Sequence, residues 1–378
     1  MGTTSNQSRI KSRTNIIQGL SSSLLPPLFS CRLSFSLFLA VLSLCLYSST
    51  SLYSSRLFAS ELSSKTSETS KVSNTKTIGI SQIVEHPALH AVREGIMEAL
   101  KENGYEEGKN LTVLYENAQG NISVSTQIAT KLISESIDVG VAISTPSAQT
   151  LFYAAKRGNH HIPIVFTAVS DPIAAKLEPG DSAYPITGVT DSPNLEALLE
   201  VMAKMLPNLK TLGLMYNSAE VNSVSTITQL KKMLQARGIK AVEVTVNSSS
   251  DVAQATQSLI GKVDALYFPQ DNTVVSALET IVNIAQQSSP RLPVILPIFA
   301  SDPVLVKKGV LAAVGFDYKD VGIETGKIIA RVLNGEEANK IPITTPKHLK
   351  SLINVPLAKK LGLTIPKEFK HSEIQLLE

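Results

Sequence analysis

Short polar clusters recur along this chain, each directly after an apolar run rich in β-branched residues. Three hydroxyl groups lie in Ser144-Thr145-Pro146-Ser147, which follows the run 139–143. We expect a helix to begin there, because proline is favoured in a first helical turn. Hydroxyls and free backbone N–H groups at a helix N-terminus suit a carboxylate. The structural alternative is an N-cap, which explains only one of the three hydroxyls. Thr167, which follows the next predicted strand along the chain, would add a further hydroxyl.

Acidic and amide side chains form the complementary clusters. Asp271-Asn272 ends the apolar run 265–268, so Asp271 is suited to hold an ammonium group through a charge-assisted hydrogen bond. An N-cap for a helix starting at Thr273 is the alternative. The segment Asn217–Ser223 likewise ends a predicted strand and begins a helix. Its polar side chains would either reach a ligand or form a capping cluster.

Three further positions complete the hypothesis, and each has a structural alternative. Glu85 would pair with an amine, or cap the helix that starts near Pro87. Asp171, before a proline, would contact ligand or only shape a turn. Asp317 would approach from a returning segment. His86 and His90 have a spacing that can bind metal, but no third ligand is evident, so no metal site is predicted.

Together these clusters predict a zwitterion clamp, with hydroxyls and helix N-termini for a carboxylate, and Asp271 with Glu85 for an amine. No catalytic residue, metal or cofactor is predicted. The predicted ligand-binding residues are Gln82, Glu85, His86, Ser144, Thr145, Ser147, Thr167, Asp171, Asn217, Glu220, Asn222, Ser223, Asp271, Asn272 and Asp317.

The elements that must position these residues alternate between strand and helix. We expect strands at 77–84, 111–116, 139–143, 162–166, 212–216, 241–246, 265–268, 294–298 and 311–316. Helical spacing occurs at 89–102, 124–134, 195–206, 224–236 and from about Tyr318 to Asn334. Such alternation implies parallel sheets with right-handed crossovers. Ligands bind at the carboxyl ends of such strands, where the polar clusters fall. The predicted fold class is α/β, with two doubly wound lobes.

Composition excludes several classes of function. The chain has 378 residues, enough for two lobes. Residues 1–59 hold five basic and no acidic residues, which leaves 30 basic and 32 acidic residues in the body. Because basic and acidic residues are nearly equal in number after residue 59, this part of the chain lacks the excess positive charge that nucleic-acid binding requires. It also lacks GxSxG, GxxxxGK[ST], GxGxxG and HExxH motifs, and we predict that it is not an enzyme.

The first 59 residues are interpreted as a signal peptide. A basic stretch precedes the apolar run 33–47, which is too short for a membrane span of about 20 residues. Two interpretations stay open: cleavage after Leu57-Phe58-Ala59, or lipid attachment at Cys45 in the lipobox-like Leu42–Cys45. Residues 60–75 are interpreted as a flexible tether. Both cysteines, Cys31 and Cys45, lie in this leader.

Seven motifs in order resemble the ABC-transporter substrate-binding family that includes tryptophan- and tyrosine-binding lipoproteins. They span about residues 76–366, and Ser170 departs from an expected threonine. The motifs are Ile80–Leu89, Ser144–Gln149, Phe166–Pro172, Thr187–Asp191, Tyr216–Ser223, Pro269–Thr273, and Gly315–Tyr318 with its continuation to Asn354. The resemblance implies a type I periplasmic-binding fold that crosses between lobes near Thr190, Ala300 and Lys340. Lobe one would be 76–190 plus 301–338, and lobe two 191–300 plus 339–378.

The resemblance also implies a function. It predicts a monomeric, extracytoplasmic substrate-binding protein of an ABC importer, in the periplasm or on the outer face of the membrane. Its partners would be a permease, its ATPase and a small solute, with an aromatic amino acid as the leading choice. A sensory or adhesive lipoprotein with the same fold is the alternative.

Overall fold

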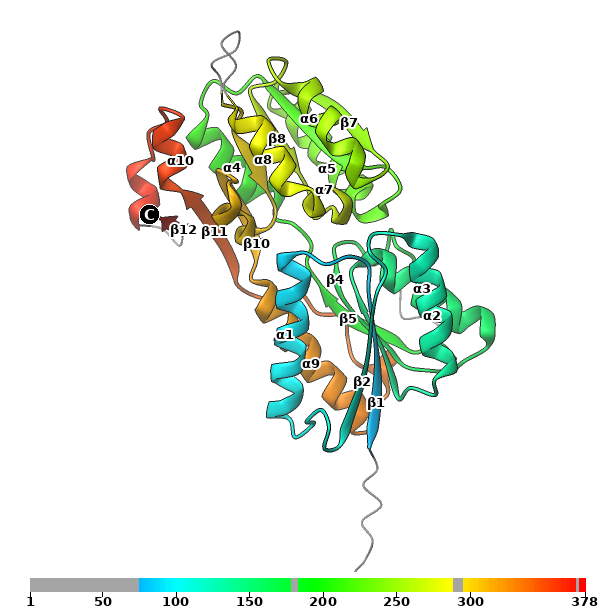
Figure 1. Ribbon diagram of the computed structural model, residues 1–378. Coiled ribbons are helices and arrows are strands. Elements are labelled where there is room, and N and C mark those ends of the chain that lie inside the picture. Colours follow the sequence, from blue (N-terminus) through cyan, green and yellow to red (C-terminus); the bar gives the residue numbers. More distant parts are fainter. Residues whose placement is uncertain (1–74, 178–182, 288–294, 372–373) are drawn as a thin grey trace, which may run out of the picture. The chain divides into compact units, whose positions relative to one another are not determined.

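The computed structural model describes residues 75–177, 183–287, 295–371 and 374–378 (Figure 1). The predicted signal peptide, Cys45 and residues 60–74 of the predicted tether lie outside the described residues. Within the described ranges, no helix combines the length and the apolar character needed to cross a membrane.

Lobe one is built on a five-stranded parallel sheet with the strand order β2-β1-β3-β4-β5. Its strands are dominated by Val, Ile and other apolar residues, and β3, β4 and β5 are buried along their whole length, as a parallel sheet covered on both faces requires. Its strands are β1 Lys76–Gln82, β2 Leu111–Asn117, β3 Val139–Ile143, β4 Ile164–Val169 and β5 Ile186–Thr190. Its helices are α1 Pro87–Glu102, α2 Ile122–Ser134, α3 Thr145–Gly158 and α9 Tyr318–Leu333.

Lobe two is built on a seven-stranded sheet with the order β12-β11-β10-β9-β8-β6-β7. All neighbours pair in parallel except β10 and β11. Its strands are β6 Thr211–Asn217, β7 Lys240–Val246, β8 Ala265–Phe268, β9 Ile298–Ala300, β10 Ala312–Phe316, β11 Leu349–Asn354 and β12 Ile374–Leu377. Its helices are α4 Leu195–Met205, α5 Val221–Ala236, α6 Val252–Leu259, α7 Asn272–Ser276, α8 Leu278–Gln286 and α10 Val355–Lys360, with short 3-10 turns η1 Ser249–Asp251, η2 Pro303–Lys308 and η4 Lys367–His371. The remaining 3-10 turn, η3 Ala338–Lys340, packs in the core of lobe one.

The predicted fold class, two α/β lobes with parallel sheets, is confirmed. The structure corrects the division of the chain, because β10 lies in the second sheet rather than in lobe one. Gly309, with φ +106, ends η2, and Leu311 then donates its N–H to the carbonyl of Ile298 at 2.8 Å. This turn brings β10 back beside β9, so the chain leaves lobe two near Asp317 and not near Ala300.

The third crossing runs beside the first. Thr344 bridges to Val189 at the end of β5, and the chain then enters β11 at Leu349. Strands β5, β11 and β12 were not among the predicted strands, and β9 begins at Ile298, where the predicted strand ends. The predicted glycine caps are confirmed at Gly104, Gly238 and Gly335, which all have positive φ.

Helices α1 and α9 lie side by side, although more than 200 residues separate them in the chain (Figure 1). Two glycines allow this close approach. A Cβ added at Gly322 would lie 2.1 Å from the carbonyl oxygen of Val92, and one added at Gly95 would lie 2.2 Å from that of Lys319. The returning helix is therefore fixed to lobe one by backbone-to-backbone contact.

Replacing Gly322 with alanine is expected to destabilise the protein by about 2 kcal/mol, because the clashing atoms are backbone and cannot rotate away. Lys327→Ala, on the exposed side of the same helix, is the matched control, with an expected change under about 0.5 kcal/mol. Urea unfolding measures both values. Equal stability of the two variants would contradict the tight contact.

Candidate functional site

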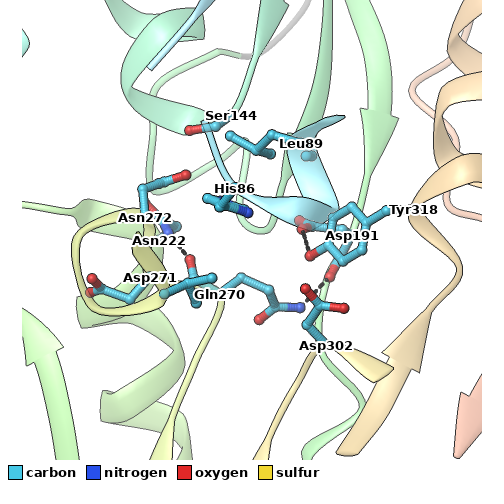
Figure 2. A pocket seen from close by; sticks show the side chains of 12 residues that line it. His86, Leu89, Ser144, Asp191, Asn222, Gln270, Asp271, Asn272, Asp302 and Tyr318 are labelled. Atoms are coloured by element: carbon cyan, nitrogen blue, oxygen red, sulfur yellow. Dashed lines mark hydrogen bonds between the residues drawn. The ribbon is translucent and has the colours of Figure 1, made fainter. Parts of the chain in front are cut away.

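A small pocket opens where the carboxyl ends of both sheets meet (Figure 2). Its volume is about 20 Å³, which is room for about one water molecule. An amino acid therefore enters only if the lobes separate or the lining side chains move. The lining residues are His86, Leu89, Ser144, Ala168, Asp191, Asn222, Gln270, Asp271, Asn272, Val275, Asp302 and Tyr318.

Several buried polar atoms around this pocket have no hydrogen-bond partner among the described residues. They include the hydroxyls of Ser144, Thr145 and Ser147, and of these Ser144 lines the pocket. Ser144 is the N-cap residue of α3, but its side chain makes no capping bond. The capping alternative therefore explains none of the three hydroxyls. A buried hydroxyl without a partner costs about 1–3 kcal/mol, which a ligand carboxylate would offset.

Backbone strain gathers at the same place. Ser144 has φ 84, and Ala168 has φ 52 at a register shift in β4. Both residues lack the freedom of glycine, and both line the pocket. Residues held in such sparsely populated conformations cluster at functional sites, where the surrounding structure fixes them.

The acidic side of the pocket is formed by Asp191 and Asp302. Asp191 lies in the first crossing and accepts hydrogen bonds from Tyr318 Oη at 2.7 Å and Ser170 Oγ at 2.9 Å. Burial raises its pKa. Burial also raises the pKa of Asp302 to about 7, and the charges of Asp191 and Asp317 add to this effect.

Among the described residues, no lysine or arginine lines the pocket, so these carboxyl groups have no basic partner in that lining. His86 supplies no positive charge either. Burial lowers its pKa to about 4, although a hydrogen bond with Asn272 and the charge of Glu85 act in the opposite direction. The imidazole is therefore neutral at physiological pH, and its Nδ1 has no partner among the described residues.

Asp271 behaves as the capping alternative predicted. Its Oδ2 accepts the N–H of Asn217 at 2.7 Å, and its Oδ1 accepts the N–H of Val274 at 2.8 Å. Burial and the neighbouring charge of Glu220 raise its pKa, while Ser223 donates a hydrogen bond that lowers it. Although Asp271 lines the pocket, both of its oxygens are used within lobe two.

Glu220 is a buried carboxylate that orients part of the pocket without lining it. Its Oε2 accepts the backbone N–H of Asn272 at 2.9 Å and the Asn272 Nδ2 at 2.6 Å. Its Oε1 accepts the N–H and the hydroxyl of Thr273 at 2.9 and 2.8 Å. These four bonds fix the amide of Asn272, which faces His86 across the pocket.

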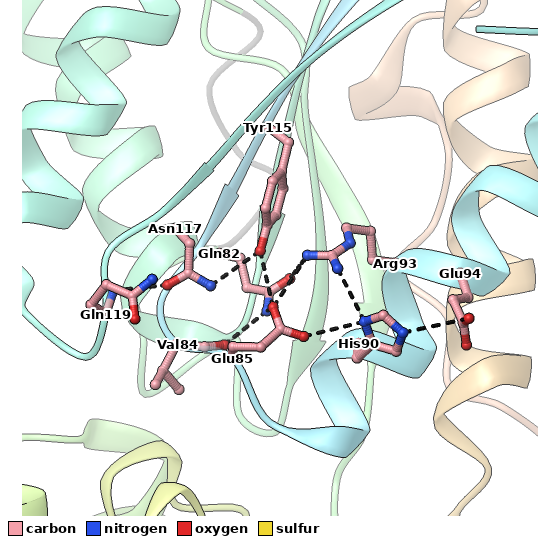
Figure 3. Close-up of polar contacts among 9 residues, drawn as sticks. All are labelled: Gln82, Val84, Glu85, His90, Arg93, Glu94, Tyr115, Asn117 and Gln119. Atoms are coloured by element: carbon pink, nitrogen blue, oxygen red, sulfur yellow. Dashed lines mark hydrogen bonds and ion pairs between the residues drawn. The ribbon is translucent and has the colours of Figure 1, made fainter.

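Gln82 and Glu85, predicted to bind ligand, belong instead to a polar network outside the pocket (Figure 3). Arg93 donates to Glu85 at 3.3 Å and lies over the ring of Tyr115. The hydroxyl of Tyr115 and Gln82 Nε2 also donate to Glu85, at 3.1 and 3.0 Å. Glu85 already has a cation in Arg93, which explains why it does not serve the pocket.

Other predicted residues are likewise used elsewhere. Asp317 caps α9 and pairs with Lys350; although burial opposes ionisation, Lys350 lowers the pKa of Asp317 overall. Asp171 accepts a hydrogen bond from Ser225 in lobe two, which links the lobes outside the pocket lining. Thr167 accepts one from Thr325. Asn217 donates to Thr273.

Of the predicted set, the structure brings five to the pocket lining: His86, Ser144, Asn222, Asp271 and Asn272. Sequence reasoning missed Asp191, Gln270, Asp302 and Tyr318. Asp191, Gln270 and Tyr318 lie within the motifs quoted above, so a signal existed for them. Asp302 carries no comparable signal, because η2 was not among the predicted elements. Among the described residues, no three His, Cys, Asp or Glu side chains are grouped to hold a metal ion.

Two α/β lobes with a polar pocket between their strand ends define a solute-binding protein. Residues 77–375 match the model of the ABC transporter substrate binding protein family, and this chain belongs to that family. A curated tyrosine-binding protein of Clostridioides difficile (strain R20291) is 37% identical over 275 residues, which are 71% of this chain and 76% of that protein.

Two solved structures extend the comparison. A Streptococcus pneumonia domain in complex with L-Trp is 32% identical, with a TM-score of 0.74 over 80% of this chain and 100% of that one. A ligand-free, open substrate-binding protein with adhesive properties from Clostridium difficile is 37% identical, with a TM-score of 0.58 over 80% of this chain and 99% of that one. The less identical of the two, the complex, thus has the higher TM-score.

Replacing Glu220 with glutamine is expected to destabilise the protein by about 2 kcal/mol, because an amide NH₂ would then face donors that need an acceptor. Glu279→Gln, at an exposed acid in the first turn of α8, should change stability by less than about 0.5 kcal/mol. Thermal unfolding compares the two. An effect no larger than that of Glu279→Gln would contradict the orienting role of Glu220.

Proposed function

We propose that this protein binds a zwitterionic amino acid with an aromatic side chain and delivers it to an ABC importer. The observation that carries the proposal is the charge of the pocket: buried acidic residues line it, and no lysine or arginine of the described part of the chain does. Such a site favours a ligand that brings its own positive charge, because unpaired buried charges are costly.

The two ends of the ligand are assigned to opposite sides of the pocket. Asp302 and Asp191 are assigned the ammonium group, because both line the pocket on the same side (Figure 2) and Asp302 accepts its bond from Val304 on Oδ1 alone among the described residues. Asp271 caps α7 and accepts from backbone donors on both oxygens, and Glu85 pairs with Arg93 outside the pocket lining. The unpartnered hydroxyls at the start of α3 take the carboxylate, where the helix N-terminus also favours negative charge. Leu89, Ala168 and Val275 supply the apolar surface for the side chain.

The comparisons support the choice of ligand. A relative 37% identical is named for tyrosine, and a structure 32% identical contains L-Trp. Both belong to the ligand class that the zwitterion clamp accommodates.

Membership of the family places the protein outside the cytoplasm. We propose that its leader directs export, and that it is either cleaved before Ser60 or lipid-anchored at Cys45. A monomer would then work with a permease and an ATPase.

A thermal-shift series on the purified protein, refolded to remove bound solute, tests the binding proposal. Tyrosine, tryptophan or both should stabilise it by about 2.7 kcal/mol at a hundredfold excess over Kd. Tyramine lacks the carboxylate, and 3-(4-hydroxyphenyl)propionate lacks the amine. Each should bind at least about tenfold more weakly than tyrosine, because each leaves one end of the pocket unpaired.

Ser144→Ala provides the internal control: it should weaken tyrosine binding but leave tyramine binding unchanged. If no aromatic amino acid shifts the melting temperature, the proposed ligand class is wrong.

An adhesive role is the second candidate, because one relative is described as a substrate-binding protein with adhesive properties. Uptake of radiolabelled tyrosine by cells lacking this protein separates the two roles. Loss of uptake supports transport. Normal uptake combined with loss of surface attachment supports adhesion.

A further inference from the structure

We infer that the ammonium group of the ligand displaces a proton held by Asp302, which lines the pocket together with Asp191, so that binding is linked to proton release. This inference rests on the proposed function and deepens it. In this inference, Asp302 gives up a proton when the positively charged ligand binds. Asp302 lies at the start of η2, a turn that the sequence did not predict.

Both carboxyl groups are shielded from solvent. Asp191 is 2% exposed and Asp302 is 4% exposed, and both line the same pocket, where Figure 2 shows them on one side. Two buried carboxyl groups that repel each other do not both ionise at neutral pH without a cation. Asn222, 3% exposed, lines the same pocket with an unpartnered Oδ1, an independent sign that a polar ligand belongs there.

The two groups differ in how readily each holds the proton. Asp191 accepts two side-chain hydrogen bonds, one on each oxygen, and these favour its ionised form. Among the described residues, the Asp302 carboxyl group accepts one hydrogen bond, from the N–H of Val304 to Oδ1 at 3.0 Å. Asp302 is therefore the group that stays protonated more readily, in agreement with its raised pKa of about 7.

Among the residues that the structure describes, no group that lines the ligand pocket supplies the missing positive charge. On the pocket side, Asp302 faces the neutral His86, Tyr318 and the further acid Asp271. On its other side lies a cavity of about 160 Å³ that also contains Lys307, Asp317 and Lys350. Lys350 is paired with Asp317, and Lys307 is exposed. Neither lysine lines the ligand pocket.

The exchange is balanced. The O–H bond of the Asp302 carboxyl group breaks, its proton passes to the buffer, and the ligand's R–NH₃⁺ donates N–H bonds to the resulting carboxylate. The ligand amine keeps its own protons throughout, so one positive charge leaves as another enters.

Calorimetry in buffers of different ionisation enthalpy counts the protons released on binding tyrosine or tryptophan. Nearly one proton should be released at pH 6 and nearly none at pH 8, and the affinity should be roughly tenfold weaker at pH 6. Asp302→Asn, which keeps the oxygen that accepts from Val304, should abolish the release. Asp320→Asn, at an exposed acid of α9, should leave it unchanged.

The stability of the ligand-free protein gives a readout that does not depend on binding. An acid whose pKa is raised in the folded state costs stability as pH rises from its unfolded pKa of about 3.9 toward its folded pKa. The melting temperature of Asp302→Asn should therefore exceed that of the wild type by a margin that grows between pH 5 and pH 7.5.

The outcomes separate the two proposals. Binding of an aromatic amino acid without proton release at pH 6, or with release that survives Asp302→Asn, overturns the proton exchange and leaves the proposed function intact. A constant stability margin between Asp302→Asn and the wild type across the same pH range also overturns it. Failure of every amino acid to bind overturns both.

Discussion

The chemistry of this molecule depends on the burial of carboxyl groups in a pocket whose lining, among the described residues, includes no lysine or arginine. Partly exposed acids nearby do have a cation: Asp317 pairs with Lys350, and Glu85 pairs with Arg93. At Asp191 and Asp302 the pairing is incomplete, and the neighbouring hydroxyls and amides are incomplete as well. The free-energy cost of these unpaired polar groups falls at one place, where the strand ends of the two sheets face each other.

Glu220 and Asp271 hold neighbouring parts of the site in position. Each is a buried acid near the pocket, yet the backbone and side-chain donors around each one satisfy its oxygens. They hold the start of α7 and the amide of Asn272 in place. Asp302 differs from these two acids, because among the described residues its carboxyl group accepts a bond on one oxygen, from the N–H of Val304.

Much of this architecture could be predicted from the sequence, because apolar periodicity and glycine caps are local signals. Strands β3 and β8 and the caps at Gly104, Gly238 and Gly335 follow directly from residue types. The placement of β10 could not, since it depends on a turn at Gly309 that pairs one strand with another. The same limit applied to the site. A strand-end aspartate predicts an acid near the pocket, but the structure was needed to show that Asp271 caps a helix and that Asp191, bonded to the distant Tyr318, also lines the pocket.

The hydrogen bond between Tyr318 and Asp191 has a mechanical meaning. Asp191 lies in the first crossing between the lobes, and Tyr318 lies just after the second, so a 2.7 Å bond ties two of the three linkers together. Thr344, in the third, is bonded to the backbone beside them. The three linkers are therefore tied to one another by hydrogen bonds, and one of the two acids that we propose to meet the ligand's ammonium group is part of that junction. If that proposal holds, the charge of the cargo is detected at the place where the lobes are joined, without a separate sensing element.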